Sequence, residues 1–264
     1  MSGNLGMAIK VSGWLVLLYV IGMGLMLWQM PDWMDAAMAQ DPQRMMDAPG
    51  FSGQSVGLVF IIILVAAIFL LWSISLVAIV WHRYILLEEV PQGFIPYRSD
   101  FHVGRYFWYG VGISLLAVLA VGVVSTFLGM ILGPFFMGSM QGLAEGQSSG
   151  VAGMAFLIGI VLGTIVAVLY LRMALILPAV ALDEGLTLGQ AWEKTSGYTG
   201  AILVLALALA FINAVVPVVI DLVFGELVWI NMALVGLYQW FYFMLGISIL
   251  STLYGVIVQK REVY

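Results

Sequence analysis

The sequence predicts an all-α integral membrane protein, and three observations lead to this fold class. Hydrophobic residues make up 63% of the 264 residues and charged residues only 9%, whereas a soluble domain carries about 25% charged residues. The charged residues are confined to short stretches between long apolar runs. None of these runs alternates with polar residues as the strands of a membrane barrel do. Because a chain in lipid must satisfy its own backbone hydrogen bonds, each run is expected to be a helix.

Six apolar runs are long enough to cross a membrane, since roughly 20 residues at about 1.5 Å per residue span its hydrocarbon core. These runs cover residues 11–30, 55–81, 107–133, 151–171, 201–223 and 227–258. We therefore expect a single membrane domain over residues 1–264, with six transmembrane helices arranged as three hairpins.

The distribution of lysine and arginine predicts the orientation of these spans. Eight of the nine basic residues lie before the first run, after the last, or in alternate connections: Lys10, Arg83, Arg98, Arg105, Arg172, Lys194, Lys260 and Arg261. Only Arg44 falls on the opposite side. Since positive charge is retained on the cytoplasmic side, both termini are expected there.

The second and fourth spans are longer than a bilayer requires. The second extends to Leu87 if His82 and Arg83 are included, and the fourth extends to Leu182 if Arg172 is included. Either helix would approach 50 Å, against about 30 Å for the hydrocarbon core. We expect the ends to tilt or to project into the cytoplasmic interface, with Pro178 breaking or bending the fourth helix.

A short polar segment after the fourth span has the pattern of an interfacial helix. Thr187 is a good N-cap for a helix over residues 188–196. Trp192 would lie on the apolar side of this helix and Lys194 on the polar side. Short helices of this kind are expected to lie on the cytoplasmic surface of the membrane.

Two features concern how the helices are related and packed. Residues 77–83 parallel residues 166–172, and an acidic pair follows each segment. This similarity indicates either an internal repeat or the chance likeness of apolar segments that end in arginine. Small-residue spacing at Gly129-x-x-x-Gly133 and Gly159-x-x-x-Gly163 predicts close helix packing in the third-to-fourth hairpin or against a partner.

The segment of residues 172–196 carries a family resemblance. Its features are Arg172, Pro178, Asp183-Glu184-Gly185, Leu188, Ala191-Trp192 and Ser196. In these positions the chain resembles the YciC-like bacterial membrane proteins and the membrane domain attached to some glycerophosphodiester phosphodiesterases. The resemblance implies a multi-pass protein of the bacterial inner membrane. This sequence has no soluble phosphodiesterase domain, so the resemblance supplies no catalytic residue.

Composition argues against several kinds of chemistry. The chain has no cysteine, which excludes disulfides, iron–sulfur clusters and thiolate zinc sites. Its two histidines, His82 and His102, are expected in one polar connection without a nucleophile or metal-ligand spacing. No basic block is present for nucleic acid. We therefore predict no cofactor, no nucleic-acid partner and no enzymatic activity.

Three basic residues are the candidates for binding an anion. Arg83 and Arg172 end the apolar cores of their helices, and with Lys194 they could form a cationic pocket for a lipid phosphate or an anionic substrate. The alternative, which we favour, is that the arginines reach the headgroups or pair with nearby carboxylates.

Polar and thioether groups in the spans have similar alternatives. Asp221 could bind a coupling ion or proton, but it lies about 30 Å along its helix from residue 201, at the outer interface. Asn213 lies deeper and is expected to form a hydrogen bond between helices. Methionines recur on the outer side at Met30, Met34 and Met38. They are a Cu(I) alternative, although packing is the interpretation that we favour, so no metal site is predicted.

Taken together, these features predict a non-enzymatic accessory or assembly protein of the bacterial inner membrane. Its expected partners are membrane lipids and either another membrane complex or a second copy of the chain. One alternative is a small transporter or permease built from the repeated hairpins. Another is a lipid-handling protein with an anionic-headgroup site on the cytoplasmic side, which as an enzyme requires a cleft joining His82, Arg83, Asp100 and His102.

Overall fold

A computed structural model describes residues 2–29, 55–93, 95–144 and 149–261. Within these residues every regular element is a helix. The order is α1 (Ser2–Gln29), α4 (Ser55–Leu87), α5 (Val103–Ala144), α6 (Ser149–Met173), α7 (Ile176–Ala181), α8 (Leu188–Ser196), α9 (Thr199–Phe224) and α10 (Val228–Ile257). The predicted all-α fold class is therefore confirmed.

By length and composition, five described helical segments could cross a membrane. They are Leu64–Leu87, Val103–Met130, Phe156–Ala181, Thr199–Phe224 and Val228–Ile257. The apolar part of α1 among the described residues, Leu5–Leu18, is shorter than a span. The chain thus has the helices of a membrane protein, while a sixth span and the orientation stay predictions.

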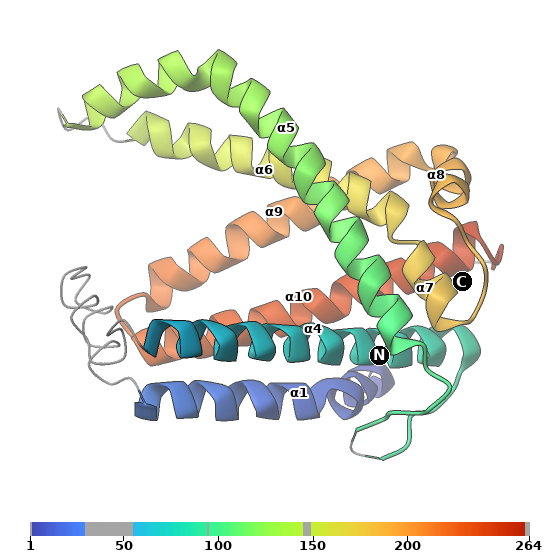
Figure 1. Ribbon diagram of the computed structural model, residues 1–264. Coiled ribbons are helices and arrows are strands. Elements are labelled where there is room, and N and C mark those ends of the chain that lie inside the picture. The colour runs from blue at the N-terminus through green and yellow to red at the C-terminus, as the bar shows by residue number, and fades with distance from the viewer. Residues whose placement is uncertain (1, 30–54, 94, 145–148, 262–264) are drawn as a thin grey trace.

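The helices gather at one end of the molecule and diverge toward the other (Figure 1). We call the gathered part the closed end; it consists of α7, α8 and the adjoining ends of α4, α5, α6 and α10. The largest cluster of buried apolar side chains lies there and includes residues 76–81 of α4 and 173–177 around the α6–α7 junction. Away from the closed end, the α5–α6 pair separates from α1, α4 and α10.

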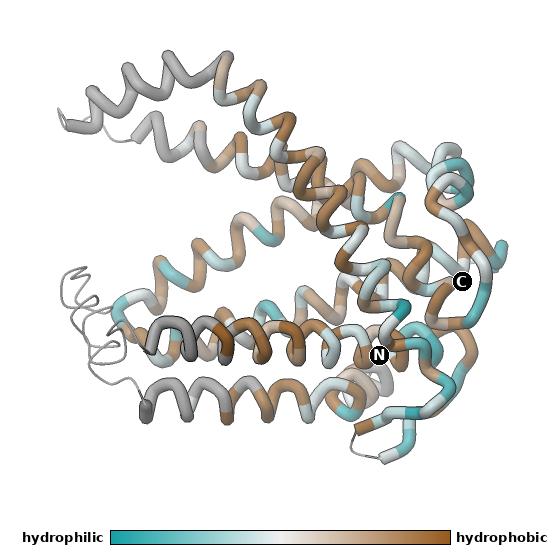
Figure 2. The backbone as a smooth tube through the Cα atoms, in the orientation of Figure 1, coloured by the Kyte–Doolittle hydropathy of each residue, from teal (hydrophilic) through white to brown (hydrophobic). Residues whose placement is uncertain are grey.

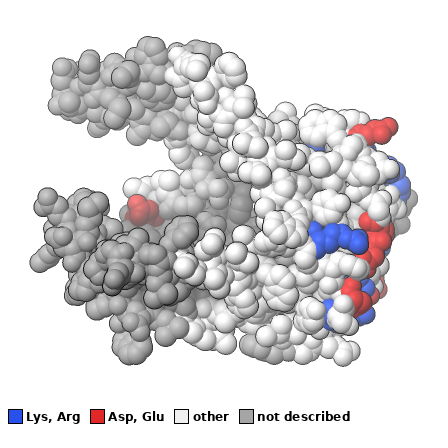
Figure 3. Space-filling view, viewed as in Figure 1, with Lys and Arg blue, Asp and Glu red and all other residues white. Residues whose placement is uncertain are grey.

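Hydropathy follows the same division. Figure 2 shows hydrophobic segments along the long helices and hydrophilic residues gathered around the closed end. On the face drawn in Figure 3, most Lys, Arg, Asp and Glu side chains also lie at this end. The same view shows a hollow between the diverging helices.

The break in the fourth predicted span lies one turn before Pro178. Helix α6 ends at Met173, and α7 begins at Ile176. Proline has no N–H to donate to the carbonyl of residue i−4, which is Ala174. That carbonyl instead accepts from the Leu177 N–H at 2.9 Å. Proline therefore bends the chain as expected.

The end of this segment is enclosed by protein, and its expected projection into the membrane interface stays a prediction. All six residues of α7 are buried, and the helix packs against α4, α5 and α10. Its sequence, ILPAVA, is apolar on every side, and a helix of that kind is stable only when surrounded by protein or lipid. Helix α7 therefore fills the centre of the closed end. By contrast, α4 continues unbroken to Leu87.

Three described helix ends share an unusual backbone conformation. Glu88 follows α4 with φ 58°, Asp183 follows α7 with φ 59°, and Lys260 follows α10 with φ 56°. The left-handed region is usually occupied by glycine at a helix C-terminus. When the two segments of the possible repeat are aligned on Glu88 and Asp183, their acidic pairs correspond. Arg83 and Arg172 do not correspond, because Arg172 lies much farther before Asp183 than Arg83 lies before Glu88.

Packing at the small-residue motif of α6 differs from the expectation. A Cβ placed on Gly163 would lie 3.4 Å from the Cβ of Ala210 in α9, and a Cβ on Gly129 would meet no atom within 4 Å. The close approach at Gly163 is thus made to the following span, α9, rather than to α5. Helix α6 also contacts α5, so it lies between the two.

Candidate functional site

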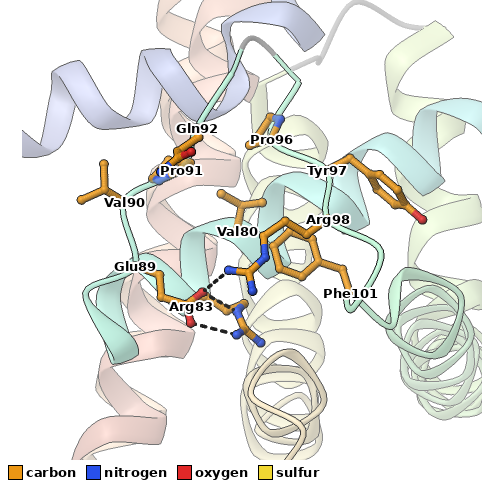
Figure 4. Close-up of a pocket in the computed structure, with 10 residues that line it drawn as sticks. All are labelled: Val80, Arg83, Glu89, Val90, Pro91, Gln92, Pro96, Tyr97, Arg98 and Phe101. Atoms are coloured by element: carbon orange, nitrogen blue, oxygen red, sulfur yellow. Dashed lines mark hydrogen bonds and ion pairs between the residues drawn. The ribbon is translucent and has the colours of Figure 1, made fainter.

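A pocket of about 450 Å³ opens beside the end of α4. Val80 and Arg83 of α4 form one wall, and residues of the 88–102 connection, including Glu89, Arg98 and Phe101, form the other (Figure 4). Two arginines and one carboxylate therefore face one another across a small volume. Their pairing decides what the pocket can bind.

Each of the three guanidinium nitrogens of Arg83 donates to a protein acceptor. Its Nε and Nη2 donate to the two carboxylate oxygens of Glu89 at 2.8 and 2.9 Å, and Nη1 donates to the Ala181 carbonyl at 3.1 Å. Only 11% of its side chain is exposed. The bidentate pair with Glu89 is among the stronger charged contacts in proteins. The bond to the Ala181 carbonyl joins the end of α4 to the end of α7.

Arg98 completes a neutral network. It donates to Glu89 at 3.3 Å and makes a bidentate pair with Asp100 at 2.8 and 3.1 Å. The Phe101 ring lies 5.4 Å from the Arg83 guanidinium carbon and 5.5 Å from that of Arg98. The hydrogen bond from Arg83 lowers the pKa of Glu89 below its ordinary value of 4.5. Two arginines are thus balanced by two carboxylates, which leaves the pocket without net positive charge for an anion.

His82 lies elsewhere than the sequence indicated. It is inside α4 and fully buried, with 0% exposure, because the helix continues past the expected end of the span. Its Nδ1 lies 2.8 Å from the Ser251 hydroxyl and its Nε2 lies 3.0 Å from the Tyr106 hydroxyl. The prediction that both histidines share a polar connection is therefore wrong.

Hydrogen positions in this network follow from its geometry. The Ser251 hydroxyl donates to the Ile247 carbonyl at 2.8 Å, so its oxygen accepts from His82 Nδ1–H. Tyr106 must then donate to Nε2, since a neutral imidazole has one donor and one acceptor. Every member is paired, and the histidine has no free nitrogen for acid–base chemistry.

His102, in contrast, is exposed in the connection before α5. Its Nδ1 lies 2.7 Å from the Asp183 carboxylate. His82 does not line the pocket that contains Arg83. The four residues required for a lipid-handling enzyme are therefore not joined in that pocket.

Three helix C-termini are tied to one another at the closed end. Arg83 of α4 donates to the Ala181 carbonyl of α7, and Arg261, after α10, donates to the Leu86 carbonyl of α4 at 2.5 Å. The Tyr254 hydroxyl of α10 donates to the Glu184 carboxylate that follows α7. Helices α4, α7 and α10 thus form a closed set of contacts. The sequence indicated Glu184 only as a possible partner for an arginine. It did not indicate a role for Tyr254, and it indicated Arg261 by its charge alone.

Arg172 has a different environment, beside α8. Its guanidinium carbon lies 4.0 Å from the centre of the Trp192 ring. Its Nε donates to the Thr195 hydroxyl at 3.1 Å and its Nη2 to the Trp192 carbonyl at 3.4 Å. No ion pair to Arg172 occurs within the ranges that the structure describes. This arginine is oriented by α8 without being neutralised.

Helix α8 has the predicted bounds and the predicted cap. The Thr187 hydroxyl accepts from the Gln190 N–H at 3.3 Å, and the Gln190 side chain accepts from the Thr187 N–H at 2.9 Å. Ala191 and Thr195 form its buried side. At 100° per residue, Trp192 and Lys194 lie on opposite flanks of that side. Lys194 is therefore separated from the flank that carries Arg172.

The intramembrane polar candidates link α9 to α10. Asn213 is exposed on α9, and its Oδ1 accepts from the Tyr238 hydroxyl at 3.4 Å. Asp221, also exposed, accepts from the Asn231 amide at 3.3 Å. The thioether candidates Met30, Met34 and Met38 lie outside the described residues. In the described part of the chain, no group of three or more His, Asp or Glu side chains is placed to hold a metal ion.

Comparison of the chain with family models, curated proteins and solved structures finds no match. The resemblance carried by residues 172–196 therefore stays a prediction.

Proposed function

We propose that the protein is a non-enzymatic accessory or assembly component of the bacterial inner membrane, with six spans and both termini in the cytoplasm. It packs laterally with lipids and with another membrane complex. The observation that supports this role is the large apolar surface of α5. Within an 18-residue stretch of the span Val103–Met130, only 11% of the residues are buried, compared with 44% in such a stretch of Leu64–Leu87 in α4.

The exposed side chains on the diverging helices are large and apolar. On α5 they include Leu119, which is 58% exposed, and Phe127, which is 63% exposed; on α9 Leu222 is 79% exposed. In lipid such surfaces associate with other helices through close packing rather than through the hydrophobic effect. A hairpin that leaves the bundle, as α5 and α6 do in Figure 1, presents this surface to a neighbour.

The polar groups at the closed end support a structural role. Arg83, Arg98 and Glu89 are paired with one another or with Asp100, and His82 is paired on both nitrogens. Their hydrogen bonds join helix ends and loops instead of leaving a reactive group free. A transporter would depend on polar groups at mid-depth such as Asn213, and we prefer the accessory role because that residue is engaged with Tyr238.

Site-specific photo-cross-linking in native membranes tests this proposal. An aliphatic diazirine residue is placed at Leu119, with the same residue at Ile113, which is 1% exposed on the same helix, as the matched control. We expect a protein adduct of discrete mass from position 119 and internal cross-links from position 113. Adducts with lipid alone at position 119 would contradict the proposed complex.

A further inference from the structure

Arg172 differs from Arg83 in how its charge is balanced. Arg83 donates to both oxygens of Glu89 and to a backbone carbonyl. Arg172 donates to one hydroxyl and one carbonyl, both neutral groups of α8. An arginine has five N–H donors, and the described residues provide acceptors for two of those on Arg172. Both hydrogens of Nη1 remain available, together with one on Nη2.

The guanidinium of Arg172 is also held in a defined position. Trp192 stacks on it at 4.0 Å, and Thr195 holds Nε. Thr195 is itself buried and donates to the carbonyls of Ala191 and Trp192 at 2.9 Å. A planar fork with its remaining donors directed away from these contacts is suited to a phosphate, which accepts two parallel hydrogen bonds.

The surroundings of Arg172 have the character of a membrane interface. Trp192 is 43% exposed and Leu188, one turn earlier, is 38% exposed on the same flank of α8. Tryptophan is enriched at the level of lipid headgroups, where its ring is half in the apolar region. A cation at this level on the cytoplasmic side is attracted by the negative surface potential of anionic lipids.

We infer that Arg172 and Trp192 form a binding site for a phosphate-bearing anion at the cytoplasmic surface of the membrane. The inference rests on the membrane placement in the proposed function, but it does not require the lateral partner. The sequence indicates Lys194 as a candidate beside Arg172, but in the structure Lys194 lies on the other flank of α8. It therefore serves as a matched control of equal charge on the same helix.

Native mass spectrometry of the full chain, purified in detergent, tests the site. Phosphatidylglycerol and phosphatidylcholine are titrated separately onto the wild type, Arg172→Gln and Lys194→Gln. We expect Arg172→Gln to lower retention of phosphatidylglycerol about tenfold, the effect of losing a charged hydrogen-bond partner. Lys194→Gln should change retention less than about twofold, and retention of phosphatidylcholine should be equal in all three proteins.

A second arm separates the two sources of the anion. Inorganic phosphate is added to the wild type loaded with phosphatidylglycerol. Displacement of the lipid assigns the site to phosphate in general, whereas retention assigns it to the lipid headgroup; both support the site. Equal loss of lipid in Arg172→Gln and Lys194→Gln, or no preference for the anionic lipid in the wild type, would overturn it.

Folding of the variants is measured by thermal unfolding in the same detergent. If Arg172→Gln does not fold, Arg172→Lys replaces it, because lysine keeps the charge but loses the stacked fork. Its retention of phosphatidylglycerol should fall below that of Lys194→Gln, and equal retention would contradict the inference. If the anion site at Arg172 is not confirmed, the cross-linking result at Leu119 is unaffected. The anion site and the proposed lateral partner are therefore tested independently.

Discussion

Buried polar side chains at the closed end are paired in chains that cross between helices. Tyr106 of α5 donates to His82 of α4, which donates to Ser251 of α10. Polar groups are costly at membrane depth unless they find partners, and a fully satisfied network avoids that cost. The same residues consequently specify which three helices meet.

Replacing His82 tests this network at the level of one hydrogen bond. His82→Leu should lower the free energy of unfolding by about 1–3 kcal/mol, because the Tyr106 hydroxyl is left buried without an acceptor. Ser251 keeps its bond to Ile247. Unfolding by denaturant in detergent measures the difference.

The double variant His82→Leu with Tyr106→Phe provides the control for this prediction. Removing both partners of a buried hydrogen bond costs much less than removing one. Most of the lost stability should therefore return. If the double variant is no more stable than His82→Leu alone, loss of packing rather than the unpaired hydroxyl explains the effect.

At the level of elements, two short helices with opposite character organise the closed end. Helix α7 is apolar on all sides and fills the centre, whereas α8 buries one narrow side and exposes the rest. Without its cap, a nine-residue helix is marginal, since helices this short are not stable alone in water. The capping box of Thr187 and Gln190 therefore contributes directly to holding α8, and through Thr195 to orienting Arg172.

Removing that cap should loosen α8 selectively. Thr187→Ala is expected to cost about 1 kcal/mol, which corresponds to about fivefold faster amide hydrogen exchange in α8. Exchange in α9 should not change. Thr187→Ser keeps the hydroxyl and should behave like the wild type, whereas equal acceleration in both variants would contradict the role of the cap.

For the whole molecule, the arrangement divides the chain into a closed end that carries most charges and an opposite part in which helices diverge. Figures 2 and 3 show this division in hydropathy and charge. Burial differs between the helices in the same way: in an 18-residue apolar stretch of each span, 44% of the residues of α4 are buried and 11% of those of α5. Tight packing at one end leaves the other end of α5 open to lipid or to a neighbouring protein.

Orientation of the whole molecule can be measured with single cysteines, because the natural sequence has none. Ser99→Cys and Glu226→Cys place a thiol at exposed positions in the connections before α5 and before α10. A membrane-impermeant maleimide applied to intact cells should label Glu226→Cys only. Permeabilised cells should show both labelled, and the reverse pattern in intact cells would contradict the proposed topology.

Sequence alone determined the properties that depend on local pattern. The apolar runs predicted the long helices, Thr187 predicted the start of α8, and Pro178 predicted the bend before α7, because length, capping and a missing N–H act within a few residues. Only the tertiary structure decided that His82 is buried, that Arg83 pairs with Glu89 and that Arg172 pairs with no described carboxylate. These outcomes depend on which helix ends meet. Hydropathy does not indicate which helices pack together, because lipid and protein are equally apolar surroundings for a spanning helix.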